Sequence, residues 1–155
     1  MYRRHLKHSR VKNLFKFVSA KMNTVFTVES ALEFDTCFHL EYSPSVKFYE
    51  AQPEGFYYTF EGRNCPYTPD FRVVDQQGNV SFIEVKPSDK VAEPDFLQRF
   101  PFKQQRAIEL SCPLKLITER QIRIDPILGN LKLLHRYSGF QSFTPLHMQL
   151  LGLVK

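Results

Sequence analysis

The amino-acid sequence predicts a mixed α/β (α+β) domain in which a central mixed sheet is flanked by helices. First, its 155 residues are within the usual length of a single domain. Second, 43% of them are hydrophobic and 14% are aromatic, which is enough to build one sizeable core. Third, helical and strand-like segments follow the order helix, several antiparallel strands, helix, strand, helix, which is typical of such a domain.

The first helix is expected from residue 27 to about residue 40. Thr27 is a suitable N-cap, and Glu29 places an acidic side chain in the first turn, where it interacts favourably with the helix dipole. Apolar residues recur at helical spacing along this segment, so one face should be buried. Ser43 and Pro44 end the helix, because the residue before a proline disfavours the helical conformation.

Short runs rich in aromatic and β-branched residues predict four strands after this helix. A turn at residues 61–64 follows the second strand, and a glycine-containing turn separates the third from the fourth. The four strands cover residues 46–49, 56–60, 71–75 and 80–85.

The C-terminal half is expected to contain two helices and one strand. A helix from residue 100 to about 110 would hold Pro101 in its first turn, where proline is tolerated. Residues 114–118 form a short buried strand, and a leucine-rich helix covers about 127–137. Residues 143–155 are apolar enough to pack but carry no clear pattern.

Positive charge is concentrated near the N-terminus. Up to Val28 the chain has seven basic residues and no acidic one, whereas the remainder has 14 basic and 16 acidic residues. Such a segment suits a polyphosphate such as DNA, because neutralising phosphates releases counterions. An organellar transit peptide or a merely solvated arm would have a similar composition. The seven are Arg3, Arg4, Lys7, Arg10, Lys12, Lys16 and Lys21.

These observations divide the chain into a basic N-terminal arm (1–26), a folded domain (27–140) and a C-terminal tail (141–155). The three cysteines are widely spaced and form no CxxC pair, so neither a zinc site nor a disulfide framework is expected. No apolar run is long enough to cross a bilayer, and no secretory signal is apparent. We therefore expect a cytoplasmic protein with reduced thiols and no membrane contact.

The strand pair 71–75 and 80–85 carries the chemically informative residues. Because side chains alternate along a strand, Glu84 and Lys86 share one face. A three-residue loop ending at Gly78 fits a type I turn followed by a left-handed glycine. That loop places Asp70 opposite Glu84, whereas a two-residue loop would place Asp70 opposite Val85.

Two carboxylates that face each other across strands destabilise a sheet unless a proton or a cation lies between them. Magnesium prefers carboxylate oxygens and water, so Asp70, Glu84 and the carbonyl of Val85 are the expected Mg²⁺ ligands, with Mn²⁺ as a substitute. Lys86 would stabilise negative charge developing on a phosphate. This is the PD-(D/E)xK pattern, and it predicts a restriction-endonuclease-like fold and a metal-dependent DNA endonuclease.

Each half of this pattern has an ordinary explanation. A Glu-x-Lys on a strand is usually a surface ion pair worth about 0–1 kcal/mol, and a Pro-Asp is usually a turn. Both together, at hairpin spacing and between apolar strand residues, favour the nuclease. Glu33 is the expected third carboxylate and Glu29 the alternative, since the two lie four residues apart on the predicted helix. Lys103, also on a predicted helix, could contact the DNA backbone or simply be solvated.

Beyond the general nuclease pattern, the chain up to Tyr137 resembles the TnsA family, the endonuclease subunits of heteromeric cut-and-paste bacterial transposases. The resemblance implies cleavage at the 5′ ends of a transposon, with metal ligands at Glu33, Asp70 and Glu84 and a catalytic Lys86. It implies two partners, a TnsB-type transposase that cuts the 3′ ends and a TnsC-type ATPase regulator. It rests chiefly on Glu29-Ser30-x-Leu32-Glu33, Gln52-Pro53, Tyr67-Thr68-Pro69-Asp70-Phe71 and Ile83-Glu84-Val85-Lys86-Pro87.

Some members of that family carry a further C-terminal winged-helix domain, and no complete one is expected in the tail 141–155. Two other functions remain open at this stage. One is another nuclease of the same fold, such as a restriction or junction-resolving enzyme. The other is a module of this fold that binds DNA or a partner without cutting.

Overall fold

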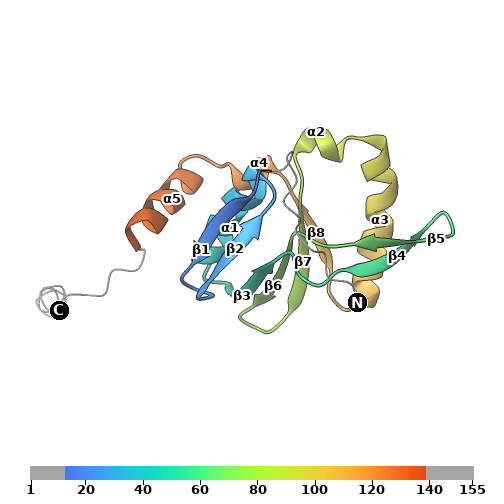
Figure 1. The fold of residues 1–155 in the computed structure, drawn as a ribbon, viewed down its shortest axis with the longest axis horizontal. Helices are drawn as coiled ribbons and strands as arrows, with labels where there is room; N and C mark the ends of the chain where they lie inside the picture. Colours follow the sequence, from blue (N-terminus) through green and yellow to red (C-terminus); the bar gives the residue numbers. More distant parts are fainter. Residues whose placement is uncertain (1–12, 139–155) are drawn as a thin grey trace, which may run out of the picture.

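A four-stranded mixed sheet forms the centre of the protein in a computed structural model that describes residues 13–138 (Figure 1). Its strand order is β3-β6-β7-β8, with β8 parallel to β7 and the other neighbours antiparallel. The elements are β1 (Phe15–Ser19), β2 (Thr24–Val28), α1 (Ala31–Tyr42), β3 (Val46–Ala51), β4 (Phe56–Phe60), β5 (Arg63–Tyr67), β6 (Phe71–Asp75), β7 (Val80–Val85), α2 (Ser88–Val91), α3 (Pro94–Glu109), β8 (Leu114–Ile117), α4 (Glu119–Ile122) and α5 (Ile127–Ser138).

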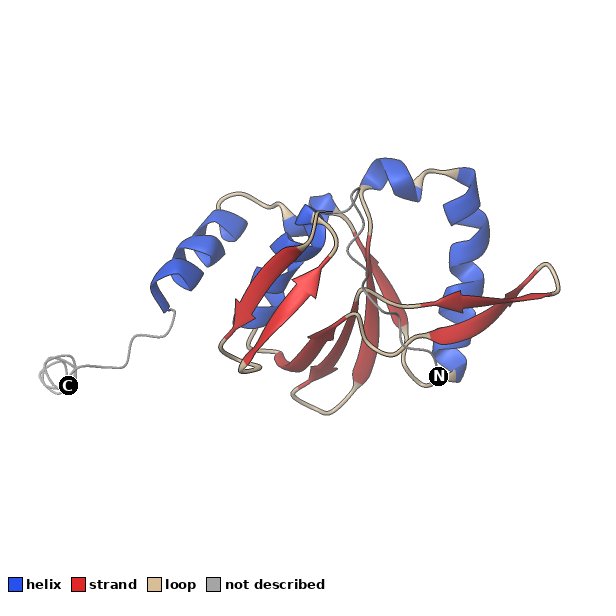
Figure 2. Ribbon diagram, viewed as in Figure 1, coloured by secondary structure: helices blue, strands red, loops and turns tan. Residues whose placement is uncertain are grey.

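Helices cover both faces of this sheet, as the sequence predicts (Figure 2). Alternate residues of β6 and β7, such as Phe71 and Ile83, belong to the core shared with α1 and the β1–β2 hairpin. Phe82 and Leu114 belong to a second core shared with α3 and the β4–β5 hairpin. The predicted mixed sheet flanked by helices is confirmed, and the architecture is of the restriction-endonuclease-like type.

The β6–β7 hairpin has the predicted register. Phe71 pairs with Ile83, and the backbone N–H of Asp75 donates to the carbonyl of Asn79 at 3.0 Å. Gly78 has a φ of 88°, a left-handed conformation that suits glycine. The loop therefore has three residues. Asp70 precedes Phe71 and Glu84 follows Ile83, so the same register places Asp70 next to Glu84.

The N-terminal prediction needs correction. Residues 24–28 form strand β2 rather than the start of a helix, and the expected boundary of the arm at residue 26 lies within that strand. Helix α1 begins at Ala31, and its N-cap is Ser30 rather than Thr27. The physical reason is tertiary: Phe17 of β1 and Val28 of β2 are almost completely buried in the core that the hairpin shares with α1, which a local helical pattern cannot reveal.

Two further boundaries differ from the prediction. The expected turn at 61–64 is shorter, because residues 63–67 form β5 and pair with β4. Helix α3 begins at Pro94, so Pro101 lies inside the helix instead of in its first turn. Burial of Phe100 and Ala107 against the second core stabilises the helix despite the missing N–H of Pro101.

Several predictions concern residues outside the described range. Arg3, Arg4, Lys7, Arg10 and Lys12 of the expected arm lie there, as does the expected tail 141–155. Within residues 13–138, no helix has the length and apolar character needed to span a membrane.

Candidate active site

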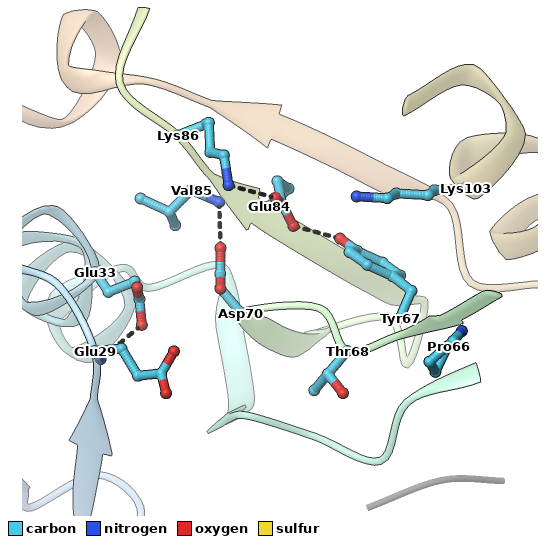
Figure 3. Close-up of a pocket in the computed structure, with 10 residues that line it drawn as sticks. All are labelled: Glu29, Glu33, Pro66, Tyr67, Thr68, Asp70, Glu84, Val85, Lys86 and Lys103. Carbon is cyan, nitrogen blue, oxygen red and sulfur yellow. Dashed lines mark hydrogen bonds and ion pairs between the residues drawn. The ribbon is translucent and has the colours of Figure 1, made fainter. Parts of the chain in front are cut away.

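A cleft of about 460 Å³ brings together the four residues that the sequence predicts to be catalytic, Glu33, Asp70, Glu84 and Lys86 (Figure 3). They come from the first turn of α1, the segment before β6, and the end of β7 with the residue that follows it. The other lining residues are Glu29, Pro66, Tyr67, Thr68, Val85 and Lys103.

Asp70 is held in place by the neighbouring strand. Its backbone N–H donates to the carbonyl of Ile83 at 3.0 Å, and its Oδ2 accepts a hydrogen bond from the N–H of Val85 at 2.7 Å. Burial raises the pKa of Asp70 well above its usual value, and the negative charges of Glu84 and Glu33 raise it further. The carboxylates therefore crowd one another, which is the condition that a bound cation would relieve.

Glu84 is buried and contacts two side chains. Tyr67 donates a hydrogen bond from its hydroxyl group to Glu84 Oε2, and Lys86 Nζ lies 3.5 Å from Oε1. Burial raises the pKa of Tyr67, and the charge of Glu84 adds to this effect, so the phenol remains a donor. The sequence does not predict Tyr67 as a site residue, because it predicts a turn at 61–64 and gives no sign of strand β5, which carries Tyr67 to Glu84.

Glu33 occupies the start of α1, where unpaired N–H groups need acceptors. Its Oε1 accepts a hydrogen bond from Ser30 Oγ at 2.8 Å, and its Oε2 accepts from the N–H of Glu29 at 3.1 Å and from Gln52 Nε2 at 3.5 Å. Burial raises the pKa of Glu33 despite these hydrogen bonds. Glu33 thus has a capping role in this fold as well as a position in the cleft, and Glu29 lines the same cleft.

Of the predicted DNA-contacting lysines within residues 13–138, Lys103 alone lines the cleft. Lys16 is exposed on β1, whereas the ammonium group of Lys21 donates to the carbonyls of Leu40, Ser43 and Val46 at 2.9, 2.9 and 3.1 Å. Lys21 is therefore engaged in closing the C-terminal end of α1, where helix carbonyls lack internal partners. These contacts argue against the predicted role of Lys21 in DNA binding.

The side chains of the cleft fit a hard divalent cation, although they do not form a ready-made cage. Among residues 13–138, no three His, Cys, Asp or Glu side chains lie close enough together to hold a metal ion by themselves. Asp70 and Glu84 nevertheless supply the oxygen donors that Mg²⁺ prefers, and Mg²⁺ usually retains several waters instead of binding an all-protein cage.

Comparison with known families agrees with this geometry. Residues 43–119 match the family described as TnsA-like endonuclease N terminal. The matched segment includes Asp70, Glu84 and Lys86, whereas helix α1 with Glu33 lies before it. A comparison with curated proteins found no match. The chain thus carries a TnsA-type endonuclease domain, which is a nuclease of the transposase type.

Proposed function

We propose that this protein is a divalent-metal-dependent DNA endonuclease that hydrolyses phosphodiester bonds at the 5′ ends of a transposon. The observation that carries the proposal is the shared cleft of Asp70, Glu84 and Lys86 within a domain of the TnsA-like type. Two carboxylates with a neighbouring ammonium group are the side chains that metal-assisted phosphodiester hydrolysis needs.

Asp70 and Glu84 would hold Mg²⁺, or Mn²⁺ in its place, with the carbonyl of Val85 as a third protein ligand. When bound, such an ion polarises a phosphate oxygen and lowers the pKa of water. Lys86 would donate hydrogen bonds to the scissile phosphate and stabilise the negative charge that develops as the bond breaks. Tyr67 would keep Glu84 in a single orientation through its hydrogen bond.

The substrate would be double-stranded DNA at transposon ends, contacted by Lys16 and by the basic residues 3–12. The protein would act in the bacterial cytoplasm with a TnsB-type transposase, which cuts the opposite strand, and a TnsC-type ATPase regulator. The family match supports the partners, and the basic residues 3–12 together with Lys16 support the DNA contact.

The test is strand-specific cleavage by the full chain, assembled with its partner proteins on DNA that carries both transposon ends. Asp70→Asn and Lys86→Ala should each reduce 5′-strand cleavage by at least about 100-fold. Lys115→Ala, at an exposed position on β8, should leave it unchanged. Undiminished cleavage by both site variants would exclude this active site.

Two other outcomes would indicate different functions. Cutting of branched or sequence-defined DNA without any partner would indicate a junction-resolving or restriction enzyme. Absence of Mg²⁺ and Mn²⁺ binding in calorimetry, with DNA binding retained, would indicate a non-cutting module.

A further inference from the structure

Lys103 reaches the active-site cleft from a different direction than Lys86. It lies on α3, which packs against β4 and β8, and its side chain points toward Tyr67 and Glu84 (Figure 3). Lys103 Nζ is 4.4 Å from the centre of the Tyr67 ring, a favourable cation–π distance. The cleft therefore holds two ammonium groups, one from the residue after β7 and one from α3.

The bonding of Lys103 differs from that of four other lysines. Lys21, Lys86, Lys90 and Lys132 all contact oxygen atoms, either carbonyls or carboxylates. Within residues 13–138, Lys103 Nζ has no oxygen partner in any hydrogen bond or ion pair, although its side chain is half-buried. An ammonium group has three donors, and leaving them unsatisfied in a partly desolvated position costs free energy.

The Tyr67 side chain explains how Lys103 is held without an acceptor. The hydroxyl group of Tyr67 is fixed by its hydrogen bond to Glu84, and the ring packs on Phe56 with its centre 5.2 Å away. The ring is therefore a rigid surface on which the Lys103 ammonium lies, with its N–H donors free to meet an incoming anion. A solvated helical position would not need this support.

We propose that Lys103 is a second phosphate-binding residue of the cleft, which contacts a DNA phosphate next to the one that is cleaved. This inference rests on the proposed function, since it identifies DNA as the ligand of the same cleft. Lys86 and Lys103 would contact successive phosphates of one strand, and Tyr67 would couple the position of Lys103 to that of Glu84. The alternative role of Lys103 is purely structural, balancing the charge of nearby carboxylates.

Salt dependence of DNA binding separates the two roles. The full chain would bind a fluorescein-labelled duplex in Ca²⁺, and anisotropy would give Kd over a range of salt concentrations. Each phosphate contact contributes about 0.9 to the slope of log K against log salt. Lys103→Met should reduce this slope by about 0.9, while Lys103→Arg and the exposed-site control Lys115→Met should retain it. A Lys103→Met slope equal to that of the wild-type protein would overturn the proposal.

A second measurement uses the wild-type protein, so its result does not depend on whether a variant folds. Amine acetylation followed by mass spectrometry compares the labelling of each lysine with and without the duplex. The duplex should protect Lys103 and leave Lys115 labelled. Equal labelling of Lys103 in both conditions would overturn the proposal.

Asp70→Asn distinguishes failure of this inference from failure of the proposed nuclease. That variant should lose cleavage but keep the wild-type salt slope and the protection of Lys103. If the wild-type protein never cleaves DNA but Lys103 is protected, the phosphate contact stands and the nuclease assignment fails. If the wild-type protein cleaves and Lys103→Met binds DNA with the wild-type slope, the inference alone fails.

Discussion

Tyr67 donates a hydrogen bond to Glu84 Oε2, and both side chains are buried. The bond joins β5 to the end of β7, two strands that belong to different sheets. It fixes the orientation of the Glu84 carboxylate, whose other oxygen faces Lys86. A residue that hydrogen-bonds to a ligating carboxylate and orients it contributes to metal affinity without contacting the metal.

Tyr67→Phe should therefore lower Mn²⁺ affinity by about 10- to 100-fold, the usual effect of losing such a partner. The aromatic ring remains, so the packing against Phe56 and the surface beneath Lys103 should persist. Calorimetric Mn²⁺ titration measures the effect, and Tyr57→Phe on the exposed face of β4 is the matched control. Identical Mn²⁺ affinities for the Tyr67→Phe and wild-type proteins would show that the hydrogen bond has no such role.

Asp70→Asn should stabilise the metal-free protein at neutral pH. The pKa of Asp70 is raised by burial and by Glu84 and Glu33, so the folded state binds this proton more tightly than the unfolded chain. Stability from this group is complete below the unfolded pKa and is lost as pH rises through the raised folded pKa. The variant keeps an oxygen for the N–H of Val85 but avoids the charge.

Thermal unfolding in a metal chelator, followed from acidic to neutral pH, checks this prediction. The variant should have a Tm a few degrees above that of the wild-type protein at neutral pH, and the difference should shrink as the solution is acidified. Saturating Mn²⁺ should reverse the order, because only the wild-type protein offers both carboxylates. A variant that is less stable at neutral pH without metal would contradict the proposed crowding of carboxylates.

Glu33→Gln and Glu29→Gln should show whether Glu33 of α1 or Glu29, which precedes the helix, contributes to the cation site. Gln can replace Glu as the capping partner of Ser30, so α1 should still form in the Glu33 variant. If Glu33 contributes to the cation site, its variant should lose at least about tenfold in Mn²⁺ affinity, and the Glu29 variant should lose less. Calorimetry and circular dichroism on both proteins make the comparison, and the reverse order would transfer the role to Glu29.

Lys21→Met should destabilise the fold by about 1–3 kcal/mol without changing the salt dependence of DNA binding. The substitution removes three hydrogen bonds to carbonyls around the end of α1 and leaves those acceptors without a protein donor. Lys16→Met, at an exposed position on β1, should show the opposite behaviour, with little effect on stability and a weaker salt slope. Denaturant titration and DNA anisotropy together test the pair.

Asp35→Asn should weaken the attachment of α5 to α1. The buried carboxylate of Asp35 accepts from Arg123 Nε at 2.9 Å and from Lys132 Nζ at 2.6 Å, and so links α1 to the residue after α4 and to α5. Both cations are about half exposed, so the expected loss is only about 1–2 kcal/mol. Hydrogen exchange should accelerate in α5 more than in β6 or β7. The exposed pair Asp95–Arg99 supplies the control, since Asp95→Asn should leave α5 protection unchanged.

The register of the β6–β7 hairpin could be predicted from the sequence because it depends on local features of the chain. A period-two pattern, a loop of defined length and a glycine in the left-handed conformation determine which residues oppose one another, so Phe71 and Ile83 could be paired without coordinates. The same reasoning placed Asp70 beside Glu84. Motifs that resemble those of the TnsA family also predicted a TnsA-type domain, which the match over residues 43–119 supports.

Only the tertiary structure decided the N-terminal hairpin and the roles of individual lysines, because both depend on contacts between residues distant in sequence. A helical pattern at 27–40 could not show that burial of Phe17 and Val28 draws residues 15–28 into a hairpin. Nor could charge alone distinguish Lys21, which binds carbonyls up to 25 positions away, from Lys103, which faces the cleft. Equal charges in a sequence acquire different roles through the desolvation and the hydrogen-bond acceptors that the fold provides.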